Sequence, residues 1–210
     1  MWLIPVEILI AYLVGAIPTA VWVGKIFYGL DIREHGSGNA GATNTVRVLG
    51  YKAGIPVLLF DVFKGWAAVQ IALLFPPGQF SPDLLIYLRM ALGVAAVLGH
   101  VFPVYAGFRG GKGVGTLAGV GIALYPLALL IVLGVFIITL AMTRYVSVSS
   151  ILGALVFPLA VVFVTGQHHP GLVILSVLVA VFVPLTHMKN INRLLKGEEN
   201  RFDFRRKDKK

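Results

Sequence analysis

The 210-residue chain contains no cysteine and few charged residues. The absence of cysteine excludes disulfide bonds, thiolate metal sites, iron–sulfur clusters and cysteine nucleophiles. Charged residues make up 13% of the chain and hydrophobic residues 58%, whereas soluble domains contain about 25% charged and about 45–50% apolar residues. A soluble fold of this size cannot hide so much apolar surface, but a lipid bilayer solvates it directly. The composition therefore predicts an integral membrane protein.

The apolar stretches lack the alternation of apolar and polar residues that marks the strands of a membrane β-barrel. Their apolarity is continuous, and most are long enough to cross a hydrocarbon core of about 30 Å as a helix. We therefore expect an all-α, polytopic membrane protein with seven transmembrane helices. The seven apolar segments cover residues 2–24, 53–75, 84–104, 114–123, 125–143, 147–165 and 171–188.

The stretch 114–143 is long for one crossing and short for two full ones. Tyr125-Pro126 offers a break, because proline cannot continue a helix from the preceding turn. Lys112 precedes the stretch and Arg144 follows it, so both ends are expected on the basic side of the membrane. The charges thus predict a hairpin whose first helix, the fourth of the seven, is short.

Lysine and arginine are missing from two of the predicted loops, 76–83 and 166–170, and sixteen of the 18 fall in the other loops and the tail. Positively charged loops stay in the cytosol, so we expect the N-terminus outside and the C-terminus in the cytosol. The same bias explains the net charge of +9, which in a soluble chain would suggest nucleic acid. No nucleic-acid partner is expected.

The first apolar segment has no basic region before it and contains Glu7, so we interpret it as an uncleaved span. We expect one membrane domain over residues 1–199 and a basic cytosolic tail over 200–210, with the tail lying against anionic lipid. No internal repeat is evident.

The first predicted cytosolic loop is rich in glycine and hydrogen-bonding side chains. Residues 36–41 match G-x-G-x-x-G, but a dinucleotide site requires a preceding strand, and a membrane span comes first here. We interpret the loop as an anion-binding nest of backbone N–H groups, and the alternative is a tight glycine-rich turn. Its candidate binding residues are Ser37, Gly38, Asn39, Gly41, Thr43, Asn44 and Arg47.

A second loop places Lys112 among Gly110, Gly111 and Gly113 at the start of the short fourth helix. It misses the Walker A pattern, because the Ser or Thr after the lysine is replaced by Gly113, so nucleotide hydrolysis is not predicted. A lysine among glycines at a helix N-terminus is nevertheless suited to phosphate. The alternative is that Lys112 only anchors the loop on the cytosolic side.

Two polar clusters lie inside or at the end of spans. Asp61 and Lys64 are one helical turn apart in the second span, and charges at that depth must be paired. At the end of the last span, His187 and Asn190 share a helical face, and His187 is a candidate general base. His168-His169 has no carboxylate nearby in the sequence, and no metal site is predicted.

Five runs of this sequence closely resemble the bacterial acyl-phosphate:glycerol-3-phosphate acyltransferases, the PlsY family. The resemblance spans nearly the whole chain and implies a seven-helix enzyme of the bacterial inner membrane. It further implies transfer of a fatty acyl group from acyl phosphate to the sn-1 hydroxyl of glycerol 3-phosphate, which yields lysophosphatidic acid for phospholipid synthesis. The runs are GSGNAGATNTVRVLG (36–50), DVFKG (61–65), GHVFPVYAGFRGGKGVGT (99–116), TRYVSVSSI (143–151) and HMKNINRLLKGEE (187–199).

The resemblance indicates which residues form the site, and their division between the substrates is our hypothesis. We expect Lys112 and the glycine amides to hold acyl phosphate on the cytosolic side, and Arg47 and the polar groups of the last span to hold glycerol 3-phosphate. The hydroxyl proton goes either to His187 or to a phosphate oxygen of a substrate. The implied catalytic residues are Ser37, Arg47, Lys112, His187 and Asn190, with Glu198 assisting in substrate binding.

We expect direct transfer without a covalent enzyme intermediate, no cofactor, and a monomer whose partners are the two substrates and membrane lipid. One alternative is a secondary transporter of a phosphorylated or anionic metabolite, although transporters usually bind near the bilayer midplane on broken helices. The second alternative is a non-catalytic lipid-binding scaffold, which would leave the two glycine-lined cationic loops unexplained.

Overall fold

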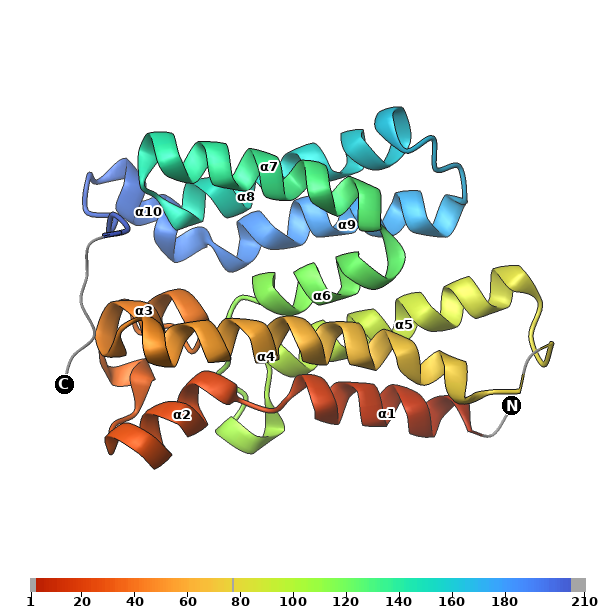
Figure 1. The fold of residues 1–210 in the computed structure, drawn as a ribbon, viewed down its shortest axis with the longest axis horizontal. Helices are drawn as coiled ribbons and strands as arrows, with labels where there is room; N and C mark the ends of the chain where they lie inside the picture. Colours follow the sequence, from red (N-terminus) through yellow and green to blue (C-terminus); the bar gives the residue numbers. More distant parts are fainter. Residues whose placement is uncertain (1–2, 77, 205–210) are drawn as a thin grey trace. The chain divides into compact units, whose positions relative to one another are not determined.

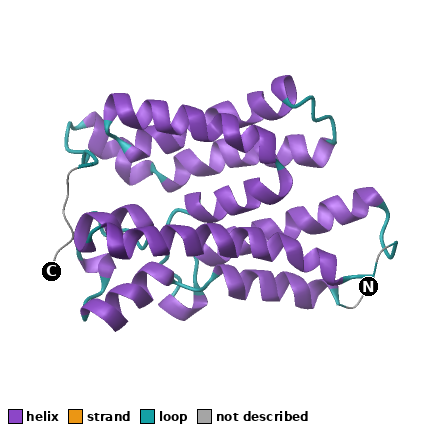
Figure 2. Ribbon diagram, viewed as in Figure 1, coloured by secondary structure: helices purple, strands orange, loops and turns teal. Residues whose placement is uncertain are grey.

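The computed structural model describes residues 3–76 and 78–204. Within them all regular structure is helical, as the sequence predicts (Figure 2). The chain divides into two compact units, the first ending at Leu124 and the second beginning at Tyr125. The single domain predicted over 1–199 stays a prediction, and residues 205–210 of the predicted tail lie outside the described residues.

In its described residues the first unit contains six α-helices (Figure 1). They are α1 (Ile4–Gly15), α2 (Thr19–Tyr28), α3 (Ala42–Leu49), α4 (Tyr51–Gln70), α5 (Pro82–Val101) and α6 (Val114–Leu124). The described part of the second unit contains four: α7 (Pro126–Thr143), α8 (Val146–Leu159), α9 (Pro170–Thr186) and α10 (Met188–Leu195). A π-helical turn, Ala160–Val164, continues α8.

Among the described residues, four helical segments are long and apolar enough to cross a membrane, and six if each of two bent helix pairs counts as one span. The bent pairs are α1 with α2 and α9 with α10, and α6 is a shorter apolar helix. The large apolar side chains on these helices are widely exposed, as expected of surfaces that face lipid. A polytopic helical membrane protein is therefore confirmed, and the number seven stays a prediction.

The first predicted span is not one continuous helix. α1 ends at Gly15, α2 begins at Thr19, and the two axes differ by 42°. Pro18 lies at the break, where it lacks the N–H that a continuous helix needs and clashes with the preceding turn. The apolar segment predicted over 2–24 therefore forms two helices, and its crossing of the membrane as one span stays a prediction.

The predicted break at Tyr125-Pro126 is confirmed. α6 ends at Leu124, and Pro126 is the first residue of α7. Proline suits that position because its missing N–H would have no partner in the helix. The short fourth helix is thus a separate element, as expected.

Glycines allow the helices of the first unit to pack closely. At Gly65 of α4, a Cβ atom would collide with the backbone carbonyl of Thr116 in α6. At Gly15 of α1, a Cβ atom would collide in the same way with the backbone of Ala96 in α5. The contacts bring α6 against α4 and α5 against α1 at backbone distance, which fixes the loops at the helix ends.

The last predicted span also bends. α9 ends at Thr186, and α10 leaves it at 56°. His187 lies between the two helices, and its backbone carbonyl accepts the N–H of Asn190 at 2.8 Å. His187 is thus the N-cap of α10 and Asn190 lies within that helix, one turn further on.

Replacing Gly65 by alanine should destabilise the protein by about 1–3 kcal/mol, because the methyl group meets a backbone carbonyl that cannot move alone. The matched control is Gly134→Ala in α7, where a Cβ meets nothing within 4 Å. Thermal melting in detergent should show a lower midpoint for Gly65→Ala only. Equal midpoints for the two variants would contradict the close packing of α4 and α6.

Candidate active site

Asn44 organises the first glycine-rich loop. Its Oδ1 accepts the backbone N–H of Ser37 at 2.8 Å, and its Nδ2 lies 3.0–3.1 Å from the carbonyls of Ile32, His35 and Asn39. The side chain is 1% exposed. The predicted substrate-binding role of Asn44 stays a prediction, and here its amide serves the loop itself.

The loop ends at the N-terminus of α3. Gly41 precedes this helix and provides no side-chain cap, so its first turn presents N–H groups with the positive end of the helix dipole. Thr43 and Arg47 lie on the helix and are half-buried. The amides of Ser37 and Gly38 bond within the loop, to Asn44 Oδ1 and the carbonyl of His35. The amides of Ser37 and Gly38 are therefore used within the loop, and the anion-binding role predicted for this nest stays a prediction.

The second glycine-rich loop folds back on the end of α5. The N–H of Gly110 donates to the carbonyl of Val101 at 3.2 Å, and the N–H of Gly111 donates to that of His100 at 3.2 Å. Lys112 follows, half-buried, and Gly113 has φ +83° in the turn that starts α6. Lys112 is thus carried by a backbone that is fixed on one side by α5 and on the other by α6.

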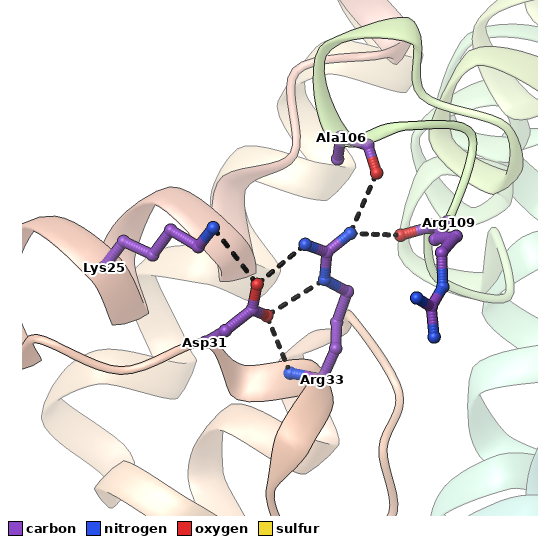
Figure 3. Close-up of polar contacts among 5 residues, drawn as sticks. All are labelled: Lys25, Asp31, Arg33, Ala106 and Arg109. Atoms are coloured by element: carbon purple, nitrogen blue, oxygen red, sulfur yellow. Dashed lines mark hydrogen bonds and ion pairs between the residues drawn. The ribbon is translucent and has the colours of Figure 1, made fainter.

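Arg33 connects the two loops (Figure 3). Its Nε and Nη2 donate to the two carboxylate oxygens of Asp31 at 2.9 and 2.7 Å. Its Nη1 donates to the carbonyls of Ala106, at 2.8 Å, and Arg109, at 3.4 Å. One guanidinium therefore joins the segment before Ser37 to the segment before Lys112.

A second contact brings the loops together at the site itself. A Cβ atom on Gly111 would lie 3.0 Å from the carbonyl oxygen of Ala40 and would collide with the ring of His100. Only glycine allows the backbone to approach so closely. The loops 36–41 and 106–113, which the sequence separates by more than sixty residues, lie side by side within the first unit.

The contacts of Arg33 with Asp31 and with the second loop, here called the Arg33 bracket, include a pair of opposite charges. Hydrogen bonds from Arg33, against the opposing effect of partial burial, hold the pKa of the Asp31 carboxyl well below its usual range. Lys25 adds a contact of 3.2 Å to the same carboxylate (Figure 3). Asp31 is therefore ionised at every pH at which the protein is expected to work, and Arg33 keeps its partner.

The second unit holds another polar cluster, centred on Glu199. Its Oε1 accepts hydrogen bonds from Ser147 Oγ at 2.8 Å and Asn190 Nδ2 at 2.6 Å, and its Oε2 accepts Arg193 Nε at 2.9 Å. His187 lies nearby in sequence, 3% exposed, with its Nδ1 2.7 Å from the carbonyl of Val183. A carbonyl only accepts, so Nδ1 carries the proton and a neutral ring has its lone pair on Nε2.

Glu199 was missed by the sequence analysis, which named Glu198. In the structure Glu198 is exposed, whereas the side chain of Glu199 is 5% exposed. Burial raises the pKa of Glu199, but the hydrogen bonds from Asn190, Ser147 and Arg193 outweigh it, so the pKa lies below its ordinary value. The role predicted for Glu198 stays a prediction.

Residues beyond Glu199 follow the turn between α7 and α8. The N–H of Phe202 donates to the carbonyl of Arg144 at 2.6 Å. The guanidinium of Arg201 lies 5.5 Å from the ring centre of Tyr145, and its Nε donates to the phenol oxygen at 3.2 Å. The contacts of Arg201 and Phe202 thus attach the chain just after Glu199 to the start of α8.

Within the described parts of the chain, no three His, Asp or Glu side chains gather in a way that could hold a metal ion. Arg33 was counted only as a cytosolic charge in the sequence analysis. Its partners in the second loop are backbone carbonyls, which every residue carries, so the residue pattern contained no signal for this connection between the loops.

Fold and site together define a polytopic helical membrane protein with two cationic, glycine-rich loops gathered at the ends of its helices. A family model described as glycerol-3-phosphate acyltransferase matches residues 6–197. The glycerol-3-phosphate acyltransferase of Chlorobium phaeobacteroides is 46% identical, over 94% of this chain and 95% of its own. That of Chlorobaculum tepidum is 45% identical, over 96% and 97%. The chain therefore belongs to the glycerol-3-phosphate acyltransferase family, as the sequence motifs predicted.

Two solved structures are also similar. Both are crystal structures of PlsY (YgiH), an integral membrane glycerol 3-phosphate acyltransferase. The glycerol 3-phosphate form has a TM-score of 0.82 and 35% identity, and the match covers 95% of this chain and 96% of that one. The lysophosphatidic acid form has a TM-score of 0.80 and 36% identity, with 95% of each chain covered.

Replacing Arg33 by lysine should lower kcat/KM for acyl transfer about tenfold, because lysine cannot reach the carboxylate and the loop carbonyls together. Tenfold corresponds to about 1.4 kcal/mol, the worth of one charge-assisted hydrogen bond. Arg109→Lys is the control, since the Arg109 side chain is exposed and points away from the bracket (Figure 3). Equal activity of the two variants would show that the bracket does not matter.

Replacing Glu199 by glutamine should destabilise the protein at neutral pH by about 1–3 kcal/mol, because charge-assisted hydrogen bonds become neutral ones. Since the folded pKa is lowered, the stabilisation is present above the ordinary glutamate pKa of about 4.3 and is lost as the pH falls through the folded value.

Melting midpoints in detergent between pH 7 and 3 measure this effect. They should converge for wild type and Glu199→Gln at the acid end, whereas Glu198→Gln should follow the wild type throughout. A constant difference between wild type and Glu199→Gln across the range would rule out the ionised network.

Proposed function

We propose that this chain transfers a fatty acyl group from acyl phosphate to the sn-1 hydroxyl of glycerol 3-phosphate, and that lysophosphatidic acid is the product. Membership of the family supports the acceptor and the reaction class. The two similar crystal structures, a glycerol 3-phosphate form and a lysophosphatidic acid form, match the proposed acceptor and product. The choice of acyl phosphate as donor rests on the sequence motifs and on the character of the loops.

The observation that carries the proposal is the meeting of two cationic loops in the first unit. Gly111 of the Lys112 loop contacts Ala40 of the loop that leads into α3. Each loop supplies backbone N–H groups at a helix N-terminus together with a basic side chain, Lys112 or Arg47. Such a pair is suited to two phosphoryl groups held near each other, one on a soluble substrate and one on a substrate with an acyl tail.

In this proposal Lys112 and the N-terminal amides of α6 hold the acyl phosphate. Arg47 and Thr43 lie on α3, directly after the loop that carries Ser37, and the family motifs assign His187 and Asn190 to glycerol 3-phosphate. Holding both substrates in reacting geometry replaces a bimolecular encounter by a positioned one, which lowers the barrier by several kcal/mol.

The reaction then requires little from the protein beyond positioning the two substrates and neutralising the charge of the leaving phosphate. The sn-1 hydroxyl oxygen attacks the acyl carbonyl carbon, the bond between that carbon and the phosphate oxygen breaks, and inorganic phosphate leaves with its bonding electrons. Lys112 neutralises the charge on this leaving group. The hydroxyl proton is taken by Nε2 of His187, whose Nδ1 faces Val183, or by a phosphate oxygen.

The acyl group passes directly between the two substrates in this scheme, so no acyl-enzyme intermediate and no cofactor are invoked. The lysine and arginine distribution supports a seven-span topology with the N-terminus outside, the C-terminus in the cytosol and the site on the cytosolic face of the bacterial inner membrane. We infer a monomer, since both loops that hold phosphate come from one chain.

Lys112→Ala should lower kcat/KM at least about a hundredfold, because the transition state loses its principal positive charge on the leaving phosphate. The control is Lys196→Ala, an exposed lysine just after α10. The assay uses purified protein in detergent with palmitoyl phosphate and radiolabelled glycerol 3-phosphate, and it scores the lipid-soluble product. Near-wild-type turnover by a folded Lys112→Ala protein would reject the phosphate-binding role.

The same assay with a second donor, and an uptake assay in sealed vesicles, separate the proposed function from its alternatives. Product formed from acyl coenzyme A but not from palmitoyl phosphate would reject the proposed donor. Uptake of labelled glycerol 3-phosphate into sealed vesicles without product would favour a transporter over an enzyme.

A further inference from the structure

A buried polar cluster in the first unit has no part in the chemistry proposed above. Asp61 and Lys64 of α4 are 3% and 1% exposed, and Lys64 Nζ lies 2.7 Å from Asp61 Oδ1. The same ammonium donates to the carbonyl of Ile17, at the break between α1 and α2, at 2.9 Å. Thr19 Oγ1 donates to Asp61 Oδ1 at 3.3 Å. The pairing predicted for Asp61 and Lys64 is therefore confirmed, and the pair has further partners.

His100, at the end of α5, links this cluster to the Lys112 loop. Its Nδ1 lies 3.6 Å from Asp61 Oδ1, and the residue is 7% exposed. The opposite edge of the ring, at Nε2, lies against Gly111, where a Cβ atom would collide with it. The carbonyl of His100 also accepts the N–H of Gly111 at 3.2 Å. Gly111, which precedes Lys112, thus contacts both the ring and the backbone carbonyl of His100.

We propose that Asp61 and His100 are positioning residues for acyl transfer, through which the charge pair of α4 sets the position of the 110–113 loop. Asp61 holds one edge of the imidazole, and the other edge supports Gly111. Lys64 balances the charge of Asp61 and ties it to the break in the first span. The inference rests on the proposed function, because it assumes that Lys112 holds the acyl phosphate.

Two features distinguish this role from simple helix packing. The charges of Asp61 and Lys64, 2.7 Å apart, neutralise each other without a histidine. His100 nevertheless has one ring nitrogen towards Asp61 and the other against the 110–113 loop. Asp61 also lies against the helix that the Lys112 loop opens, since a Cβ atom on Gly115 of α6 would be 3.1 Å from the Cβ of Asp61. A change in the cluster should therefore act on the substrate that the Lys112 loop holds and not on the other.

The first test is His100→Gln, which leaves the Asp61–Lys64 pair intact. We expect the KM for palmitoyl phosphate to rise about tenfold, while the KM for glycerol 3-phosphate stays within about twofold of wild type. The control is His168→Gln, an exposed histidine in the loop before α9. A His100→Gln protein with a wild-type KM for palmitoyl phosphate would overturn the proposal.

The second test removes both charges at once with Asp61→Asn and Lys64→Met together, since neutralising only one would leave a buried charge without its partner. Its melting midpoint in detergent should stay near that of wild type, and its KM for palmitoyl phosphate should rise as in His100→Gln. A lower midpoint with both KM values unchanged would show that the cluster only stabilises the fold.

The two proposals fail in different ways. If wild-type protein makes no product from palmitoyl phosphate, the proposed function is wrong and the positioning role falls with it. If wild type is active and the KM values of the variants do not separate by substrate, only the positioning role is wrong.

Discussion

Hydrocarbon offers no hydrogen-bond partner, so a charge carried into a membrane-length helix must find its partners within the protein. Lys64 finds two, the carboxylate of Asp61 and the carbonyl of Ile17. That carbonyl lies at the turn where Pro18 interrupts the first apolar segment. The carbonyl left free by the broken span and the buried ammonium thus satisfy each other. In the proposed scheme the placement of Asp61, of His100 and of the loop against it depends on this exchange.

The contacts that shape the site are mainly between side chains and backbone. The side chain of Arg33 holds the second loop by carbonyl groups, and that of Asn44 holds the first by carbonyls and an amide, while the ring of His100 lies against the backbone of Gly111. Glycine is needed where two backbones or a ring and a backbone touch, as at Gly111. Lys112 and Arg47 are thereby carried on rigid supports, which is how a protein positions charged substrates without moving parts.

The sequence predicted what depends on residue type and missed what depends on the path of the backbone. Continuous apolarity was enough for the helices, Pro126 for the break before α7, and the cost of burying charge for the Asp61–Lys64 pair. The break at Pro18 had the same proline signal but lay inside an unbroken apolar run. Glu199 could not be told from Glu198, because which of two adjacent carboxylates turns inward is set by the chain after α10.

Glu199 follows both of its neutral donors in the chain, which gives the second unit a particular sensitivity to truncation. Ser147, in α8, and Asn190, in α10, donate to the same carboxylate oxygen. A chain cut before residue 199 would keep every helix of this unit. The hydroxyl of Ser147 and the amide of Asn190 would nevertheless both lose this shared acceptor.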